Sequence, residues 1–282
     1  MNTPSPVALV LCGGGSRGAM EVGFYRAIRE LGLPVDLVVG SSIGALNGAC
    51  IAAGMTVDEM VRLWCTIRRR DVARFSLRGV FTPRRHPAFL SLAPLRRLLR
   101  QVLPVTRLED LAIPLTVVTT DLQQGQPVYW SGTGDLMEPL IASMSLPGVF
   151  PPVDIDGHQF VDGGIANNVP LDKAVELGAR TILIVYCNCC EASPRPFRGA
   201  VPVLVRSFSI TLDRKFSVEL ERFGALVHMH SVQPRFPREI AMLDFRYTAE
   251  LIEVAYRQTL EYFARANAPP DMSLVPAMAP EG

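Results

Sequence analysis

The sequence predicts an α/β domain in which a mostly parallel central sheet lies between layers of helices. Over the first 55 residues, short apolar runs that end in glycine-rich turns alternate with segments of helical spacing. Such alternation produces right-handed crossovers between parallel strands. Of the 282 residues, 49% are hydrophobic and 20% are charged, which supplies a large core and excludes a disordered chain.

Two strand–helix units are expected at the start of the chain. The first combines a buried strand at residues 7–12 with a helix at 19–31, because apolar residues recur at helical spacing up to Gly32. The second combines a buried strand at 35–39 with a helix of small residues at 45–53. Each strand leads directly into glycines, so both turns allow close backbone approach.

The remainder is expected to complete one domain, residues 1–282, with its core at about 7–190. Residues 62–107 interrupt the alternation with prolines and arginines and are interpreted as a basic insert. The later elements expected are strands at 113–121 and 127–131, a helix at 136–143, a hairpin of 153–155 and 158–161 around an Asp-Gly turn, a helix at 171–177, a final core strand at 181–187, a C-terminal helix at 244–264 and a frayed tail at 267–282.

Charge and cysteine content limit the class of protein. The 28 basic and 27 acidic side chains give a net charge of +1, which argues against a nucleic-acid partner. Six scattered cysteines do not form an extracellular disulfide framework. The sequence contains no run of 18 consecutive apolar residues, which is the length that a membrane-spanning helix needs. We therefore expect a cytoplasmic protein with, at most, peripheral membrane contact; no oligomeric state is predicted.

Gly40-Ser41-Ser42-Ile43-Gly44 fits the G-x-S-x-G pattern of a nucleophile elbow, between an expected strand and an expected helix. Only Ser42 fits as the nucleophile, because Ser41 would need glycine at positions 39 and 43. The alternative is an ordinary turn rich in glycine and serine.

Residues 13–18, Gly-Gly-Gly-Ser-Arg-Gly, also match a dinucleotide-binding pattern. That reading requires an acid at the tip of the second strand, whereas Asp36 lies at its other end. A glycine-rich turn before a helix can instead bind an anion through its amides. One strand away from Ser42, these amides would face a developing oxyanion.

The activating base for Ser42 has two candidate sources. His228 and His230 follow the serine in the order used by α/β-hydrolases, but they lie in an alternating, strand-like run without a loop. Asp162-Gly163-Gly164 follows the expected hairpin and presents an aspartate at a turn. A simple Asp-Gly turn is the alternative reading of this second motif.

These three motifs, in this order, together with residues 142–152, resemble the patatin-like phospholipase family over about residues 7–190. The resemblance implies a three-layer α/β/α fold and a Ser–Asp dyad, with Ser42 as nucleophile and Asp162 as general base, and neither cofactor nor metal. It places the oxyanion hole at Gly13, Gly14, Gly15 and Arg17, and it makes Gly18, Gly40, Gly44, Gly163 and Gly164 motif positions.

The resemblance also implies hydrolysis of fatty-acyl esters, with a phospholipid or lysophospholipid as substrate. A general carboxylesterase or thioesterase of the same fold, and a catalytically silent lipid-binding protein, are the alternatives. Residues 62–107 contain twelve arginines and one acid, Asp71, interleaved with apolar residues. A solvated helical face is the default for such a run, but so large an excess favours contact with an anionic lipid surface. The apolar residues concerned are Phe75, Leu77, Val80, Phe81, Phe89 and Leu90.

Overall fold

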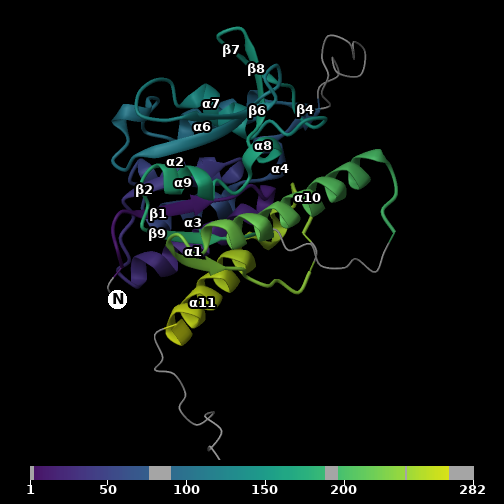
Figure 1. Cartoon of the computed structure of the whole chain (residues 1–282). Coiled ribbons are helices and arrows are strands. Elements are labelled where there is room, and N and C mark those ends of the chain that lie inside the picture. Colours follow the sequence, from purple (N-terminus) through teal and green to yellow (C-terminus); the bar gives the residue numbers. More distant parts are fainter. Residues whose placement is uncertain (1–2, 76–89, 188–195, 239, 267–282) are drawn as a thin grey trace, which may run out of the picture.

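The computed structural model describes residues 3–75, 90–187, 196–238 and 240–266, and its centre is an eight-stranded sheet (Figure 1). The strand order is β10-β9-β1-β2-β5-β8-β7, and β6 pairs with β5 as well. Five strands run parallel: β1 (Val7–Leu11), β2 (Leu37–Ser41), β5 (Leu115–Asp121), β9 (Thr181–Val185) and β10 (His228–Val232). The predicted mostly parallel sheet is confirmed.

The remaining strands of this sheet are antiparallel to their neighbours. Strands β6 (Gln126–Trp130) and β8 (His158–Asp162) run opposite to β5, and β7 (Val153–Ile155) runs opposite to β8. The β7–β8 hairpin turns at Asp156 and Gly157, both with positive φ, as the Asp-Gly signal predicts. A separate pair joins β3 (Arg74–Phe75) to β4 (Leu90–Ser91).

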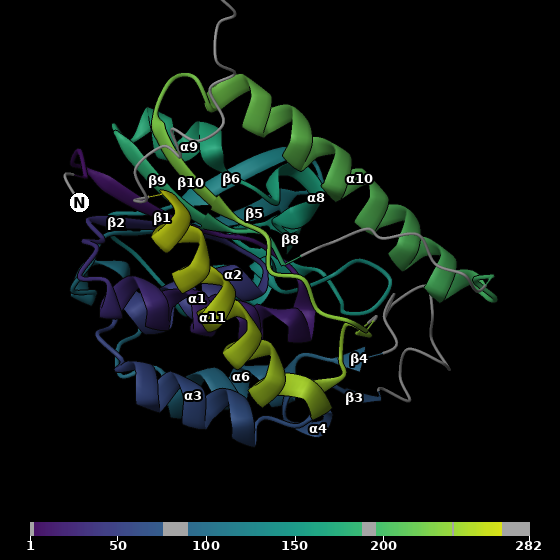
Figure 2. The ribbon, with the colours of Figure 1, turned by 90° about the horizontal axis from the view of Figure 1, so that it is seen from below.

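Helices cover both faces of the sheet (Figure 2). On one face lie α1 (Ala19–Glu30), α2 (Ile43–Ala52), α3 (Val57–Thr66), α6 (Ala93–Val102), α7 (Met137–Ser143) and α11 (Thr248–Ala266). On the other lie α9 (Leu171–Glu176) and α10 (Ala200–Phe223). Strand β1 is apolar throughout because its alternate side chains, such as Leu9 and Val10, enter the two different cores.

The structure corrects several expected boundaries. Strand β2 begins two residues later than predicted, because Asp36 pairs through its amide and its carboxylate with the backbone of Val7. Residues 244–247 form a capped turn and a short 3₁₀ helix before α11, since the Asp244 carboxylate accepts the Arg246 amide. The strand β9 is not the final one: β10 follows it and pairs with it.

The 24-residue helix α10 was not expected from the sequence, and it forms much of one helical layer. The edge strand β10 contains His228 and His230, whose alternating run had the pattern of a strand. Within the basic insert, Trp64, Leu95 and Leu99 belong to the main core, so the described part of the insert packs on the rest of the fold. In the described part of the chain, no helix combines the length and apolar character needed to cross a bilayer.

Candidate active site

Ser42 lies at the sharp turn between the end of β2 and the start of α2. Its backbone is in a positive-φ conformation, with φ of 54° and ψ of −127°, which side chains rarely adopt. The turn is closely packed: a Cβ on Gly44 would lie 2.4 Å from the Leu11 carbonyl, and one on Gly40 would lie 2.6 Å from the Gly44 oxygen. The geometry is that of a nucleophile elbow.

Asp162 reaches Ser42 from the last residue of β8. The register pairs Ser41 with Val118 and Asp162 with Thr119, so the antiparallel strand ends level with the elbow. Ser42 Oγ donates a hydrogen bond of 2.7 Å to Asp162 Oδ2. The two predicted residues are therefore brought together.

The environment of Asp162 suits a proton acceptor near neutral pH. The residue is buried, and Gly164 donates its amide to Oδ1 at 2.8 Å. Burial raises the pKa of Asp162 to about 6, while hydrogen bonds from Ser42 and Gly164 act in the opposite direction. The carboxylate is thus ionised at pH 7 yet holds a proton far better than an exposed aspartate does.

Residues 143–145 connect the two members of the dyad. Ser143 Oγ accepts the Ser42 amide at 2.8 Å and donates to the Val118 carbonyl at 2.6 Å. The Ser145 carbonyl accepts the Asp162 amide at 3.0 Å. The family resemblance includes this segment, but the sequence alone did not indicate that Ser143 would hold the nucleophile's backbone.

The backbone amides of the predicted oxyanion hole differ in whether they already donate a hydrogen bond within the protein. The Gly13 amide donates to Asn168 Oδ1 at 2.9 Å, and the Arg17 amide donates to the Gly14 carbonyl at 3.3 Å. In the described part of the chain, the amides of Gly14 and Gly15 have no acceptor. Of the four predicted residues, these two therefore have amides that can receive a substrate oxygen.

A buried polar network supports the glycine-rich loop from below. Glu21 Oε1 accepts the Cys12 amide at 3.0 Å, and Oε2 accepts Asn47 Nδ2 at 2.7 Å. Trp64 Nε1 in turn donates to Asn47 Oδ1 at 2.8 Å. Burial raises the pKa of Glu21 to about 8, so its carboxyl group is largely neutral at pH 7. No motif in the sequence marked this network.

Asn168 links the glycine-rich loop to the Asp162 turn. A Cβ on Gly13 would lie 2.5 Å from Asn168 Oδ1 and 2.9 Å from Ser42 Cβ, while one on Gly164 would lie 2.9 Å from the same oxygen. A Cβ at either position would therefore require the Asn168 side chain to shift. Asn168 Nδ2 is buried without a partner among the described residues. Sequence reasoning missed this residue, which follows α8 (Gly164–Asn167).

The remaining motif glycines also mark close contacts. A Cβ on Gly163 would lie 2.2 Å from the Val118 carbonyl oxygen, and one on Gly18 would lie 2.7 Å from Ile43. Gly15 has φ of 61°, and a Cβ there would lie 2.4 Å from the Met242 side chain. The backbone around residue 242 therefore packs against the glycine-rich loop, and the Ser16 amide donates to the Met242 carbonyl at 2.7 Å.

The histidines that the structure describes make contacts other than with Ser42. His228 and His230 lie on the edge strand β10 with ring centroids 4.7 Å apart, and burial lowers the pKa of His230. His158 contacts Asp121 Oδ2 at 2.8 Å. His86 lies outside the described residues. The hydroxyl of Ser42 is directed to a carboxylate.

The arginine-rich segment is partly neutralised. Arg96 pairs with Glu138, and Arg107 pairs with Glu109 at 2.7 Å, so acids beyond residue 107 compensate some of its charge. Phe75 is 73% exposed, whereas Leu90 is buried in the core and cannot meet a lipid surface. The other apolar residues of the expected membrane contact, Leu77, Val80, Phe81 and Phe89, lie outside the described residues.

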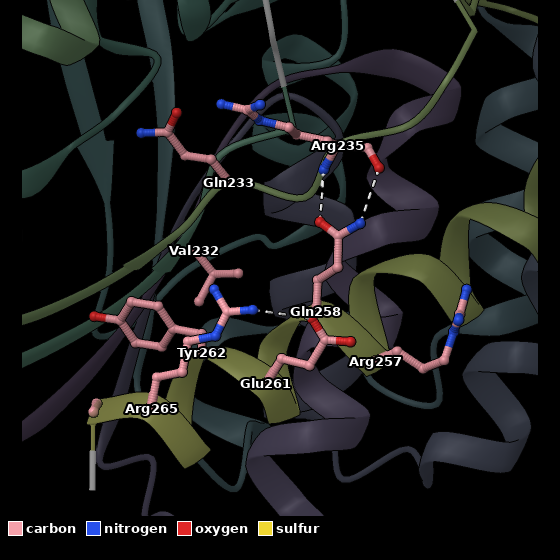
Figure 3. A pocket seen from close by; sticks show the side chains of 9 residues that line it. Val232, Gln233, Arg235, Arg257, Gln258, Glu261, Tyr262 and Arg265 are labelled. Atoms are coloured by element: carbon pink, nitrogen blue, oxygen red, sulfur yellow. Dashed lines mark hydrogen bonds and ion pairs between the residues drawn. The ribbon is translucent and has the colours of Figure 1, made fainter. Parts of the chain in front are cut away.

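A groove of about 680 Å³ lies between the end of β10 and the C-terminal part of α11 (Figure 3). It contains three arginines, Arg235, Arg257 and Arg265, and the Gln258 side chain bonds to the backbone of Arg235. The residues that line it include no member of the dyad or of the glycine-rich loop. The groove is therefore separate from the candidate active site.

Comparison with known proteins identifies the family of the chain. The family model "Patatin-like phospholipase" matches residues 9–175. The chain belongs to the patatin-like phospholipase family. The matched range contains the glycine-rich loop, the elbow and Asp162, so all three motifs lie in the patatin-like part of the chain.

Curated relatives match about two thirds of the chain. Mouse patatin-like phospholipase domain-containing protein 6 is 35% identical over 190 residues, which cover 65% of this chain and 14% of the mouse protein. An uncharacterised NTE family protein of Mycobacterium bovis is 33% identical over 188 residues, covering 67% of this chain and 51% of that protein. The chain therefore matches only part of each relative's length.

Solved structures show the same fold. VipD from Legionella pneumophila covers 93% of this chain and 67% of its own, with a TM-score of 0.52 and 15% identity. ExoU of Pseudomonas aeruginosa, in complex with SpcU, covers 93% and 53% with a TM-score of 0.50 and 16% identity. At such low identity these structures support the three-layer architecture alone.

Proposed function

We propose that this patatin-like protein is a serine acyl hydrolase that cleaves fatty-acyl esters of phospholipids or lysophospholipids. The observation that carries the proposal is the 2.7 Å hydrogen bond from Ser42 Oγ to Asp162 Oδ2. A nucleophile at an elbow, bonded to a buried carboxylate with a raised pKa, is an arrangement suited to acyl transfer. Family membership favours a lipid ester as the substrate.

In the proposed first step, Asp162 accepts the Ser42 hydroxyl proton while Oγ attacks the ester carbonyl carbon. The bond to the alcohol then breaks, and Asp162 returns the proton to the leaving oxygen. In the second step Asp162 accepts a proton from water, whose oxygen attacks the acyl-enzyme. The fatty acid leaves, and Ser42 regains its proton.

The oxyanion hole is assigned to the amides of Gly14 and Gly15. Both lack an acceptor in the described part of the chain, whereas the amides of Gly13 and Arg17 already donate elsewhere. Donors that are fixed before substrate binds stabilise the tetrahedral intermediate without reorganisation, and each contributes about 3–4 kcal/mol in other enzymes. The N-terminus of α2, next to Ser42, adds a positive dipole end.

The proposal includes peripheral contact between the arginine-rich segment and an anionic membrane surface. Arg69, Arg70 and Arg74 are exposed, and Phe75 beside them is 73% exposed. Cations flanking an exposed aromatic side chain favour the boundary between lipid headgroups and acyl chains. A general carboxylesterase or thioesterase of the same fold would not require this contact.

The test is labelling by a fluorophosphonate probe, followed by mass spectrometry of the products formed from mixed phospholipids and lysophospholipids. Wild-type protein is expected to be labelled on Ser42 and to release fatty acid from dispersed lipid. Ser42→Ala should abolish both activities while circular dichroism remains unchanged, because it removes one hydroxyl and little packing.

Ser41→Ala is the matched control. The buried Ser41 hydroxyl has no partner among the described residues, so its loss should leave labelling and hydrolysis near wild-type values. A folded Ser42→Ala variant that hydrolyses esters at the wild-type rate would refute the dyad. Hydrolysis confined to soluble esters would replace the phospholipase assignment with a carboxylesterase, and an unlabelled wild-type protein would indicate a silent lipid-binding protein.

A further inference from the structure

The first half of α10 carries an exposed apolar surface that the proposed chemistry does not use. Val203, Leu204 and Ile210 are 46%, 58% and 45% exposed. In a helix, residues seven positions apart share one face, so Val203 and Ile210 align, while Leu204 projects about 100° further around the helix and widens the exposed apolar stripe. These three side chains form what we call the α10 apolar surface.

Charge is distributed unevenly along this part of the chain. Between Glu191 and Asp213 the sequence contains three arginines and no acid. The second half of α10, in contrast, contains the acids Asp213, Glu219 and Glu221 beside the bases Arg214, Lys215 and Arg222, so its charges balance. Exposed apolar residues accompanied only by cations are typical of a helix that lies in the boundary layer of an anionic bilayer.

One end of the α10 apolar surface reaches the segment that supports the dyad. A Cβ on Gly148 would lie 3.8 Å from Leu204 Cδ2. Gly148 lies three residues after Ser145, whose carbonyl accepts the Asp162 amide. Leu204 is therefore adjacent to the loop that follows Ser145.

Further along, α10 contacts α8, which follows Asp162 directly. Lys215 Nζ donates to the Ala166 carbonyl in α8, and Ile165 in the same helix is 43% exposed. Both views place the start of α10 on the same side of the molecule as the β3–β4 pair (Figures 1 and 2). The start of α10 and the β3–β4 pair of the arginine-rich segment thus lie on one side of the molecule.

We propose that the α10 apolar surface enters a lipid surface and holds the dyad against the ester bonds of that surface. The inference rests on the proposed function, because a dispersed lipid substrate is what such a surface would have to meet. A second copy of the chain fits less well: an isologous contact through this face would bring the arginines of one copy close to those of the other.

The experiment compares wild-type protein with a Leu204→Asp/Ile210→Asp double variant. Co-sedimentation is measured with vesicles of phosphatidylcholine and phosphatidylglycerol, at low salt and at about 0.5 M NaCl, where charge effects are screened. Hydrolysis of the vesicle lipid and of a short-chain, water-soluble ester is measured in parallel. Val218→Asp is the matched control, because Val218 is 60% exposed on the same helix but lies in its acid-containing half.

The double variant should bind vesicles and hydrolyse their lipid about tenfold less, since two apolar anchors are replaced by charges. The loss should persist at high salt, and hydrolysis of the soluble ester should remain within about twofold of wild type. Val218→Asp should behave as wild type. If the Asp variant does not fold, Leu204→Ser/Ile210→Ser replaces it, with the same loss of vesicle binding expected.

Equal vesicle binding by folded double variant and wild type would overturn the proposal. A change from dimer to monomer with unchanged vesicle binding would instead identify the surface as a contact between copies, which also overturns it. If wild type hydrolyses no ester but loses vesicle binding on the double substitution, the proposed function fails while the docking surface stands.

Discussion

At the residue scale, the proposed chemistry depends on a carboxylate that is buried but still ionised at neutral pH. Asp162 has its pKa raised by burial to about 6, and two hydrogen bonds limit that rise. An exposed aspartate, with a pKa near 3.9, would be too weak a base to take a serine proton efficiently. Burial next to Ser42 therefore raises the pKa of Asp162 into the range that suits its proposed role as a base.

Hydrolysis of a soluble ester should follow this pKa. The rate constant kcat/KM should fall as pH decreases through about 6, because only the carboxylate form of Asp162 accepts the Ser42 proton. Asp162→Asn should lower kcat by about 10²–10⁴-fold, since an amide cannot act as the base. Replacing His228 and His230 together should cost little, and the opposite pattern would indicate a histidine-based triad.

The raised pKa of Asp162 also predicts how the stability of the fold depends on pH. Because the native pKa of Asp162 lies above its unfolded value, this group favours the folded state at low pH, and that contribution is lost as pH rises through about 6. Asp162→Asn removes the titration. As the pH is raised from 4.5 to 7.5, thermal unfolding should therefore show the variant becoming more stable relative to wild type. An equal difference at both pH values would contradict the assigned burial effect.

At the element scale, the elbow exists because α2 packs almost directly on the backbone of β1 and β2. A Cβ on Gly44 would lie 2.4 Å from the Leu11 carbonyl carbon and oxygen, which cannot move without shifting the central strand. Gly48, one turn later in α2, would place a Cβ 2.9 Å from a Val38 side-chain methyl, which can adjust. The two glycines thus differ in the kind of atom they face.

This difference predicts unequal effects of alanine. Gly44→Ala should lower the free energy of unfolding by about 1–3 kcal/mol or prevent folding, through backbone overpacking. Gly48→Ala should be much milder, because the higher helix propensity of alanine, worth about 1 kcal/mol, offsets the side-chain contact. Urea denaturation of both variants measures the difference. Equal destabilisation would mean that the close approach of α2 to β1 does not limit the turn.

At the scale of the whole molecule, a net charge of +1 conceals a strongly uneven distribution. Arginines concentrate in residues 62–107, and three more occur without acids between Glu191 and Asp213. Within the first of these regions, the β3–β4 pair lies on the same side of the molecule as the start of α10 (Figures 1 and 2). A charged face on a nearly neutral molecule orients it towards an anionic surface.

Neutralising Arg69, Arg70 and Arg74 together should weaken binding to phosphatidylglycerol vesicles at low salt, by about 1 kcal/mol per residue near the surface. The effect should vanish at high salt, and a soluble ester should still be hydrolysed. Arg68 is left unchanged, because its guanidinium donates to the Cys65 carbonyl at the end of α3.

The control for this variant neutralises the three arginines of the groove in Figure 3, Arg235, Arg257 and Arg265, which removes the same charge from another part of the surface. Vesicle binding should then remain near the wild-type value. Equal loss in both triple variants would show that net charge, rather than the arginine-rich segment, governs the interaction, and no loss in either would leave residues 62–107 as an ordinary solvated surface.

The sequence by itself determined the features that depend on short-range order. Gly40 and Gly44 around Ser42 specify the elbow, Asp156-Gly157 specifies the hairpin turn, and the apolar runs specify buried parallel strands. Each signal lies within a few residues, because turn geometry and strand burial are imposed by local sterics and side-chain type.

Only the tertiary structure decided which distant groups meet. Strand β8 runs antiparallel to β5, and that register brings Asp162 level with Ser42 across 120 positions of sequence. Asn168 accepts the Gly13 amide from 155 positions away, so among the described residues the amides of Gly14 and Gly15 are the ones we assign to the proposed oxyanion hole. Such pairings depend on strand order and register, which are set by packing of the whole sheet rather than by any local motif.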